Sequence, residues 1–395
     1  MNPVFSIGSY LLMQLFTFLI TRWCLKDFAF AKKENGTWRA WTKAVLVIYT
    51  IVMLLPVAGA MLPSGKLHNF CQGRGNVFLA FFVYFGGVLL ILWLITMIIR
   101  AVSKKKSRVL KGICLGAALA AGIILPLYGI PHAKHTIVID YDVTIPGGEE
   151  KDLKIVLISD LHLSVNTSYS HMEKVVDLIN AQHADAVLIA GDIFTSDYST
   201  LKDPDKYSAL LSTIEAKDGV YAVYGNHDVQ ETLFGGFPIT PISMAFRSTE
   251  MEQFMKDCHF NILYDETALI ADGAVQIVGR IDGEKAGDGT ADRKSPEEVL
   301  SGTDPEKPVI VLQHEPVEFA ALKEAGADLA LCGHTHEGQF FPGNVFTPLF
   351  NENSFGYKKV AGLDTIVSAG VGFYGPPMRV GTDSDISVIN LHIGG

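Results

Sequence analysis

Polar side chains that can bind metal ions follow five short apolar runs in the second half of the chain. The runs are 155–158, 186–190, 220–224, 309–312 and 329–331. The segments that follow them are Asp160-Leu161-His162, Gly191-Asp192, Gly225-Asn226-His227-Asp228, His314 and Gly333-His334-Thr335-His336. Ligand sites in open α/β sheets form just past the carboxyl ends of the strands, so we expect these segments to meet on one rim.

Carboxylate, amide and imidazole groups make up this candidate ligand set. The seven candidate ligands are Asp160, His162, Asp192, Asn226, His314, His334 and His336. A set without thiolate is unlike a structural zinc finger, and imidazole with carboxylate suits Mn, Fe or Zn. Seven ligands exceed what one tetrahedral ion uses, so the set predicts two divalent metal ions. Two ions about 3.5–4 Å apart can clamp a phosphoryl group and activate a bridging hydroxide.

The five segments, in this order, resemble the motifs of the calcineurin-like metallophosphoesterases. The resemblance covers about residues 152–393 and is greatest to the small membrane-associated bacterial phosphoesterases. The later segments 368–373 and 377–379 also resemble the C-terminal pattern of those proteins.

This resemblance implies a fold, an activity and a role for each motif residue. The implied fold is a two-sheet sandwich flanked by helices. The implied activity is hydrolysis of a phosphodiester, pyrophosphate or phosphomonoester by attack of a metal-bridging hydroxide. The implied roles are one ion held by Asp160, His162 and His336, a second held by Asn226, His314 and His334, Asp192 as the bridge, and His227 as acid or transition-state donor.

Three residues beside these motifs need a separate interpretation. Asp228 either holds the imidazole ring of His227 or caps a helix that follows. Glu337 stands where close relatives usually have Gly, and Ser164 stands where relatives often have Gly. The carboxylate of Glu337 either disfavours a very anionic substrate or points to solvent. Neither residue removes a ligand from the set.

The second half of the chain has the alternation of an α/β domain. The five apolar runs read as strands, and the expected helices are 171–180, 208–216, 251–257 and 316–324. Short apolar strands separated by helices predict a buried sheet covered on both faces. The stretches 274–281 and 366–391 indicate strands without intervening helices, which predicts a second sheet packed on the first. A further strand is expected at 137–139.

Composition divides the 395 residues into two contrasting parts. Residues 1–130 carry 14 Lys and Arg against 2 Asp and Glu, whereas residues 131–395 carry 18 against 40. The acidic part argues against nucleic acid as a partner, because phosphate binding needs basic clusters. With 49% apolar and 19% charged residues, intrinsic disorder is excluded. Five cysteines form no disulfide framework, and we expect Cys258 and Cys332 to be packed thiols.

Four uncharged apolar runs in the first part are long enough to cross a bilayer. They cover residues 4–21, 44–62, 77–99 and 112–130. A helix rises about 1.5 Å per residue and a bilayer core is about 30 Å thick. We therefore expect a four-helix transmembrane anchor at 1–130 and a catalytic domain at 131–395, with the lipid bilayer as a partner. Pro56 and Pro126 are expected to bend their helices.

Basic residues in the connections predict the orientation of this anchor. The first and third connections carry six Lys and Arg each, and the second carries only Lys66 and Arg74. Connections rich in Lys and Arg stay in the cytoplasm. The chain is therefore expected to be a multi-pass protein of the cell membrane, with residues 131–395 on the extracytoplasmic side.

The sequence thus favours a membrane-anchored, metal-dependent phosphoesterase that acts on a phosphate ester, with a lipid or envelope component as the expected substrate. The alternative is a non-catalytic membrane scaffold or sensor that keeps the same fold. Transport by the four helices is disfavoured, because the apolar runs hold no Asp, Glu, Lys or Arg. The oligomeric state is left open.

Overall fold

The computed structural model describes residues 3–104, 107–234 and 237–394, and it divides into two compact units. The first unit consists of Met1–Pro131 together with two short excursions from later in the chain, Thr232–Thr240 and Gly375–Met378. The second unit consists of the remaining residues, from His132 onward. The two excursions were not expected from the sequence.

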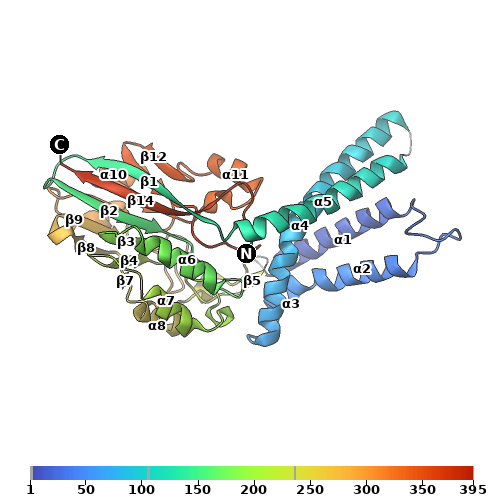
Figure 1. Cartoon of the computed structure of the whole chain (residues 1–395), viewed down its shortest axis with the longest axis horizontal. Coiled ribbons are helices and arrows are strands. Elements are labelled where there is room, and N and C mark those ends of the chain that lie inside the picture. Colours follow the sequence, from blue (N-terminus) through green and yellow to red (C-terminus); the bar gives the residue numbers. More distant parts are fainter. Residues whose placement is uncertain (1–2, 105–106, 235–236, 395) are drawn as a thin grey trace. The chain divides into compact units, whose positions relative to one another are not determined.

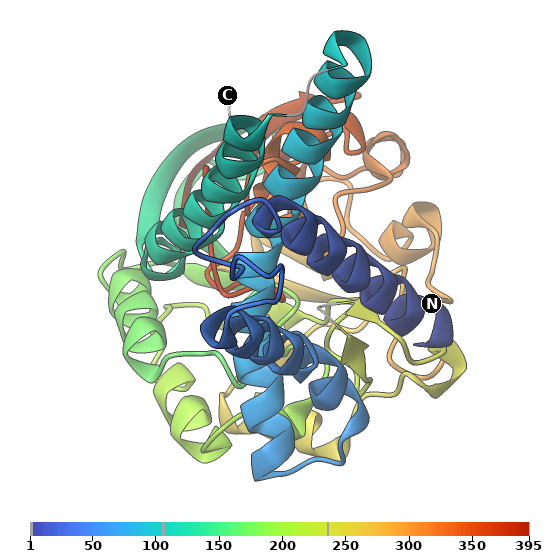
Figure 2. The same cartoon turned by 90° about the vertical axis from the view of Figure 1, so that its right-hand side faces the viewer.

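The first unit is built from helices (Figure 1, Figure 2). Their bounds are α1 (Pro3–Leu25), α2 (Ala40–Met53), α3 (Leu55–Met61), α4 (Lys66–Ser103) and α5 (Arg108–His132). Four segments are long and apolar enough to cross a membrane: Phe5–Leu25, Ala40–Met61, Lys66–Ser103 and Arg108–His132. These segments contain the four apolar runs almost completely.

Two details of these helices differ from the sequence-based expectation. The helix expected to bend at Pro56 is interrupted at Leu54, between α2 and α3, because proline cannot donate the next helical hydrogen bond. Helix α4 is 38 residues long, or about 57 Å, so Lys66 and Arg74 lie on the helix and not in a connection. Lys105 and Lys106, which the sequence places in the third connection, lie outside the described residues.

Helix α4 contacts α1, α2 and α3 of the first unit. One apolar cluster joins Cys24 of α1, Leu89 of α4 and Cys114 of α5. A second cluster joins Tyr10 and Leu79 to Phe234 of the Thr232–Thr240 excursion, where the rings of Tyr10 and Phe234 meet edge to face at 5.1 Å. The first excursion is thus part of the apolar packing of this unit.

The second unit contains two six-stranded mixed sheets. The first has the order β1 (Thr136–Ile145), β14 (Ser384–Ile393), β2 (Lys151–Ile158), β3 (Ala186–Ala190), β4 (Val220–Val223) and β7 (Asn261–Ile262). The second has the order β12 (Gly356–Val360), β13 (Leu363–Val367), β11 (Leu329–Cys332), β10 (Val309–Leu312), β9 (Val275–Gly279) and β8 (Glu266–Ile270). Strands β2, β3, β4 and β7 are parallel, and so are β13, β11, β10 and β9. A small sheet pairs β5 (Leu233–Phe234) with β6 (Phe237–Pro238).

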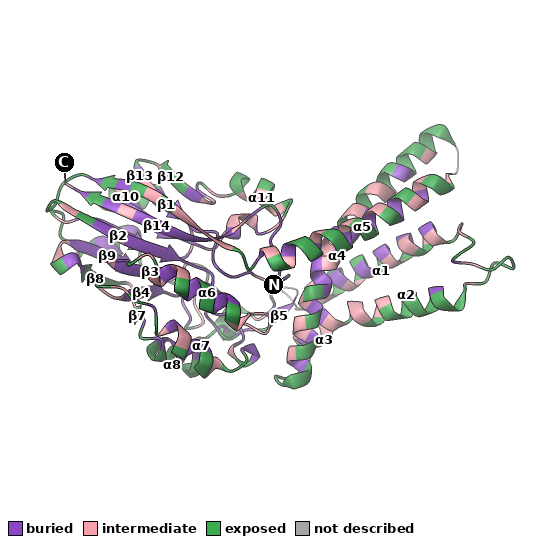
Figure 3. Ribbon diagram, in the orientation of Figure 1, coloured by how far each residue is buried: buried purple, intermediate pink, exposed green. Residues whose placement is uncertain are grey.

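Alternation along the strands explains how the two sheets pack. In β2, Ile155 and Leu157 enter the core between the sheets, whereas Val156 and Ile158 face helices on the other side. In β10, Ile310 faces the core between the sheets in the same way. Both faces of each sheet are therefore buried, and Figure 3 shows the strand interiors as buried.

Helices cover the outer face of each sheet. Helices α6 (Tyr169–Asn180), α7 (Pro204–Leu211) and α8 (Thr249–Asp257) pack on the first sheet, and α9 (Pro296–Leu300) and α10 (Phe319–Glu324) pack on the second. The remaining helical segments are α11 (Gly343–Phe346), η1 (Tyr198–Thr200), η2 (Ile242–Met244), η3 (Ala271–Gly273), η4 (His336–Gly338) and η5 (Thr347–Leu349). The expected α/β fold, a two-sheet sandwich flanked by helices after four apolar helices, is confirmed.

Three sequence-based assignments are corrected by the structure. Strands β10 and β11 belong to the second sheet and not to the sheet of β2, β3 and β4. The stretch 366–391 divides, with β13 in the second sheet and β14 in the first. The helix expected at 208–216 ends at Leu211, where Ser212 and Thr213 donate their hydroxyls back to backbone carbonyls. Cys258 and Cys332 are buried free thiols, as expected.

Candidate metal centre

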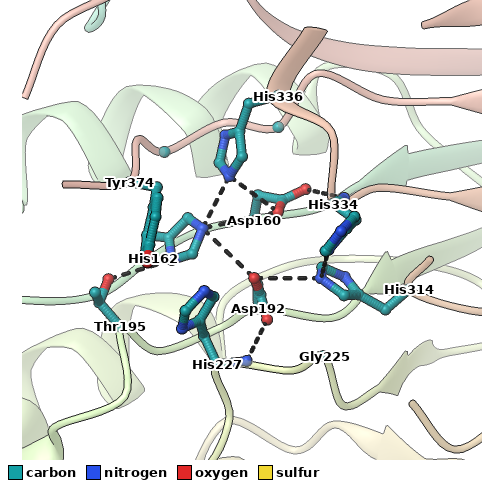
Figure 4. A network of polar contacts seen from close by, with 12 residues as sticks. Asp160, His162, Asp192, Thr195, Gly225, His227, His314, His334, His336 and Tyr374 are labelled. Carbon is teal, nitrogen blue, oxygen red and sulfur yellow. Dashed lines mark hydrogen bonds and ion pairs between the residues drawn. The ribbon is translucent and has the colours of Figure 1, made fainter. Parts of the chain in front are cut away.

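The seven predicted ligands and His227 come together in the second unit. Figure 4 shows His227 with six of them: Asp160, His162, Asp192, His314, His334 and His336. Asp160, Asp192 and Asn226 follow β2, β3 and β4 of the first sheet. His314 and His334 follow β10 and β11 of the second sheet. The rim that the sequence predicted for one sheet is therefore formed by two sheets, each contributing the carboxyl ends of parallel strands.

The first group of ligands is Asp160, His162 and His336, and all three are buried. His336 Nε2 lies 3.2 Å from Asp160 Oδ1 and 2.9 Å from His162 Nε2. Asp160 Oδ1 is buried and has no hydrogen-bond partner among the described residues. Two imidazole nitrogens and an unpaired carboxylate oxygen directed at one another form a donor set that a cation would satisfy. These residues therefore fit a bound divalent ion.

The second group surrounds His314. Its Nε2 lies 3.2 Å from Asp192 Oδ2, 3.1 Å from Asn226 Oδ1 and 3.2 Å from His334 Nδ1. The other ring nitrogen, Nδ1, lies 2.7 Å from the carbonyl oxygen of Ala190 and must donate its proton there. In the neutral form of the ring, which a metal ion requires, the lone pair of Nε2 is directed at the group, as in metal-binding histidines held by a backbone carbonyl. Burial opposes protonation of His314, but the carboxylate of Asp192 holds its pKa well above the usual value.

Asp192 lies between the two groups. Its Oδ2 is 3.6 Å from His162 Nε2 and 3.2 Å from His314 Nε2. Its Oδ1 accepts a hydrogen bond from the backbone N–H of His227 at 2.8 Å. The carboxylate can therefore contact an ion in either group, which fits the bridging role expected from the resemblance.

Five of the ligands have left-handed backbone conformations that side chains rarely adopt. Asp160, His162, Asp192, His334 and His336 have φ between 45° and 75°. Each such residue costs free energy, which the surrounding structure must supply. The strand exits thus turn sharply enough to bring several ligand side chains back over the rim.

Gly191 and Gly225 make room for these turns. Gly191 has φ of 81°, and a Cβ atom there would lie 2.6 Å from the backbone nitrogen of Gly225. A Cβ atom on Gly225 would lie 2.3 Å from Asp192 Oδ1 and 2.8 Å from His314 Cγ. Gly225 is therefore required by close approach to the bridging carboxylate.

Asp228 has a role that neither sequence-based alternative described. Its carboxylate accepts hydrogen bonds from the backbone N–H of Phe194 at 2.9 Å and of Gly225 at 2.8 Å. Among the described residues, the carboxylate of Asp228 forms no hydrogen bond with the His227 ring, and no helix follows it, because residues 226–227 form a turn and 228–229 a bend. Asp228 instead ties the loop after β3 to the loop after β4.

Contacts of the His227 ring come from residues that the sequence did not indicate. Nδ1 lies 2.7 Å from Ser196 Oγ, and the ring packs against Tyr374 with centroids 4.6 Å apart. Ser196 Oγ also donates to Glu231 Oε1 at 3.0 Å. A serine, a glutamate and a tyrosine outside the five motifs carry no pattern that marks them in a single sequence.

Burial controls the charge of several groups in the centre. It lowers the pKa of His162 and of His334 to about 4 each, which favours the neutral imidazole that binds metals. Burial raises the pKa of Asp160 to about 7, and a divalent cation would favour its charged form. Burial also opposes ionisation of Asp192, but the positive charge of His314 holds its pKa well below the usual range.

Acidic side chains flank the second group. The carboxylate of Glu284 accepts a hydrogen bond from Asn226 Nδ2 at 2.8 Å. The Oδ1 atom of Asn226 is therefore directed at His314. Glu284, Glu315 and His334 have ligand atoms within 4.8 Å of one another.

Glu337 is half-buried, and burial raises its pKa to about 7 while Arg379 opposes the shift. It therefore does not simply point to solvent. Ser164 donates its backbone N–H to Thr167 Oγ1 at 2.8 Å.

Residues 153–338 match the family model described as calcineurin-like phosphoesterase. A Bos taurus "transmembrane protein with metallophosphoesterase domain" is 30% identical over 60% of this chain and 53% of its own length. The Chlamydia trachomatis UDP-2,3-diacylglucosamine pyrophosphatase LpxG is 25% identical over 47% of this chain and 64% of its own length. The chain therefore spans less than two thirds of each of these relatives.

One solved structure matches this chain at low sequence identity. The 5'-nucleotidase precursor of Thermus thermophilus is 14% identical, with a TM-score of 0.34, over 61% of this chain and 55% of that protein.

Replacement of Gly225 tests the packing around Asp192. In Gly225→Ala the new methyl group must displace the Asp192 carboxylate, so we expect lower divalent-metal content and a loss of stability of about 1–3 kcal/mol. Gly302→Ala is the matched control, because a Cβ atom there has no neighbour within 4 Å. Metal analysis and thermal unfolding of both purified variants check this. Equal metal content in Gly225→Ala and Gly302→Ala would contradict it.

Proposed function

Because residues 153–338 form a calcineurin-like phosphoesterase domain, we propose that this chain is a membrane-anchored hydrolase of phosphoric esters that uses two divalent metal ions. The observation that carries the proposal is the convergence of two overlapping ligand groups on Asp192. Asp160, His162 and His336 would hold one ion, and Asn226, His314 and His334 the other. A non-catalytic scaffold is less well supported, since all seven candidate ligands are retained, and six of them are buried together with His227.

The residues of the site have different roles in the proposed hydrolysis. When bound, a pair of cations would supply an activated water nucleophile and neutralise the charge of the phosphoryl oxygens. Asp192 sets the separation of the two ligand groups, because one carboxylate serves both. His227 lies beside Asp192 without taking part in either group, so its ring can serve the leaving oxygen of the ester.

Chelation and metal analysis test this proposal directly. We expect about two transition-metal ions per chain under saturating Mn and loss of phosphodiester hydrolysis with a chelator, followed by recovery on readdition of metal. Asp192→Ala should lower both metal content and activity more than His334→Ala does, because it removes a ligand from both groups. At most one ion per chain, with activity unaffected by chelation, would rule out the two-metal site.

Membrane anchoring is supported by the four apolar helices and by the transmembrane relative. The extracytoplasmic placement of the catalytic unit rests on the excess of basic residues in the first and third connections. The second connection is reduced to Leu62–Gly65 in the structure, and it still carries fewer basic residues than the others.

Reporter fusions test the orientation. A reporter that is active only outside the cytoplasm should work when it is fused after residue 395 or within Leu62–Gly65, and should fail at Lys104. A cytosolic reporter at the same three positions is the reciprocal control. The reverse pattern would return the catalytic unit to the cytoplasm.

The substrate that we propose is a phosphodiester or pyrophosphate on a lipid or envelope component. Only residues 133–135 separate the end of α5 from the start of β1, so the catalytic unit is tethered at a short distance from the membrane. The relative LpxG is by its name a pyrophosphatase of a diacylated sugar nucleotide. Both observations favour an amphiphilic substrate over a soluble nucleotide.

An exposed apolar segment of the catalytic unit supports the same substrate class. It follows the turn that carries His336, and its exposed side chains are Phe341, Val345, Phe346, Leu349 and Phe350. These side chains are 53–83% exposed, and residues 338–351 contain no Asp, Glu, Lys or Arg (Figure 3). An uncharged aromatic surface of this kind suits acyl chains or the interfacial region of a bilayer.

Paired substitutions on this segment test the substrate class. The double variant Phe346→Ser/Leu349→Ser should lower kcat/KM about tenfold or more for lipid-linked pyrophosphates in vesicles, because it removes two apolar contacts. It should leave hydrolysis of bis(p-nitrophenyl) phosphate unchanged. Leu269→Ser is the control, since Leu269 on β8 is 55% exposed outside this segment. Faster turnover of short soluble monoesters than of any lipid-linked compound would contradict the proposal.

A further inference from the structure

A chain of buried polar groups extends from the His227 ring away from the metal ligands. His227 Nδ1 lies 2.7 Å from Ser196 Oγ, and Ser196 Oγ lies 3.0 Å from Glu231 Oε1. Lys285 Nζ donates to the same Glu231 oxygen at 2.6 Å and to the backbone carbonyl of Asn226 at 3.0 Å. All of these side chains are buried.

The ammonium group of Lys285, at one end of this chain of polar groups, determines which group donates in each hydrogen bond. The ammonium group of Lys285, 2.6 Å from Glu231 Oε1, requires that oxygen to be an acceptor. Ser196 must therefore donate its only hydroxyl proton to Glu231. The remaining Ser196 lone pair then accepts from His227 Nδ1, so Nδ1 carries a proton in every state of the ring.

A second contact fixes the plane of the ring. Tyr374 packs against His227 at 4.6 Å and against His162 at 5.4 Å between ring centroids. With Nδ1 bound to Ser196 and the plane set by Tyr374, Nε2 is the ring nitrogen left for a bound substrate. Figure 4 shows the His227 ring beside His162 and Asp192.

We propose that Ser196 and Glu231 are positioning residues for catalysis, which hold His227 in the tautomer protonated on Nδ1 and reserve Nε2 for the leaving group. The inference rests on the phosphoesterase function proposed above. As the bond between phosphorus and the leaving oxygen breaks, its electron pair passes to that oxygen. The oxygen takes a proton from Nε2 of the imidazolium, and the ring returns to the neutral form with its remaining proton on Nδ1, hydrogen-bonded to Ser196 Oγ.

Removing the acceptor at position 231 reverses the chain. In Glu231→Leu the Ser196 hydroxyl has no carboxylate to which it can donate, so it donates to Nδ1 and moves the ring proton to Nε2. Nitrogen-15 NMR of the full-length protein labelled at histidine reports this tautomer without any assay of activity. The His227→Ala variant identifies the resonances of His227. The wild type should show Nδ1–H, and Glu231→Leu should show Nε2–H.

Kinetics provide the second readout. Glu231→Leu and Ser196→Ala should lower kcat about 10²-fold or more for an alkyl phosphodiester, and less for a nitrophenyl ester, whose leaving group needs less protonation. Ser196→Thr keeps the hydroxyl and should restore most of the rate. Metal content should match the wild type in all three variants. Glu252→Gln is the control, because Glu252 is an exposed carboxylate on α8.

Each outcome bears on the inference. An unchanged Nδ1–H tautomer in Glu231→Leu, or an equal loss for both leaving groups, would overturn it. A fall in metal content in Glu231→Leu would also overturn it, since Glu231 would then act on Asn226 through Lys285. A wild-type protein without phosphoesterase activity would refute the proposed function, and the tautomer measurement would still decide the role of Glu231.

Discussion

Burial of the Asp192 carboxylate is the interaction on which the metal centre depends. A desolvated carboxylate is costly unless positive charge and hydrogen-bond donors surround it. Here Oδ1 accepts from the backbone of His227, and Oδ2 lies between His162 and His314. Glycine is needed at position 225, because the Cβ atom of any larger residue would overlap the Asp192 carboxylate. The carboxylate of Asp192 therefore lies within 3.6 Å of a histidine nitrogen in each of the two ligand groups.

The two-sheet fold supplies what a single sheet could not. Three ligand segments follow β2, β3 and β4, and two follow β10 and β11, so the site is closed from two sides. The core between the sheets, with Leu157 and Ile310 among its residues, keeps the two rims in register. Left-handed backbone at five ligands is tolerated because each exit is held by a rigid buried strand. Specificity is then left to loops, among them the apolar segment that follows His336.

The convergence of the candidate ligands was predictable from the sequence, because each belongs to a motif that follows an apolar strand. The strands themselves were found at nearly their observed bounds, since buried parallel strands read as short apolar runs. The sheet to which each strand belongs was not predictable. Strands β4 and β10 are both short apolar runs, and only their hydrogen-bonding to distant strands shows that they belong to different sheets. Asp228 was misread for a similar reason, because its partners, the backbone groups of Phe194 and Gly225, are invisible in sequence. Ser196 and Glu231 were missed because their role depends on three-dimensional proximity to His227.

Electron paramagnetic resonance of the full-length protein loaded with Mn²⁺ tests the central claim most directly, because two ions bridged by one carboxylate are magnetically coupled. The account predicts the multiline spectrum of a coupled Mn²⁺ pair in the wild type. It predicts that Asp192→Ala loses this coupling, because the shared ligand is gone. A wild-type spectrum of isolated Mn²⁺ alone, at saturating metal, would contradict the assignment of Asp192 as the bridge between two ions.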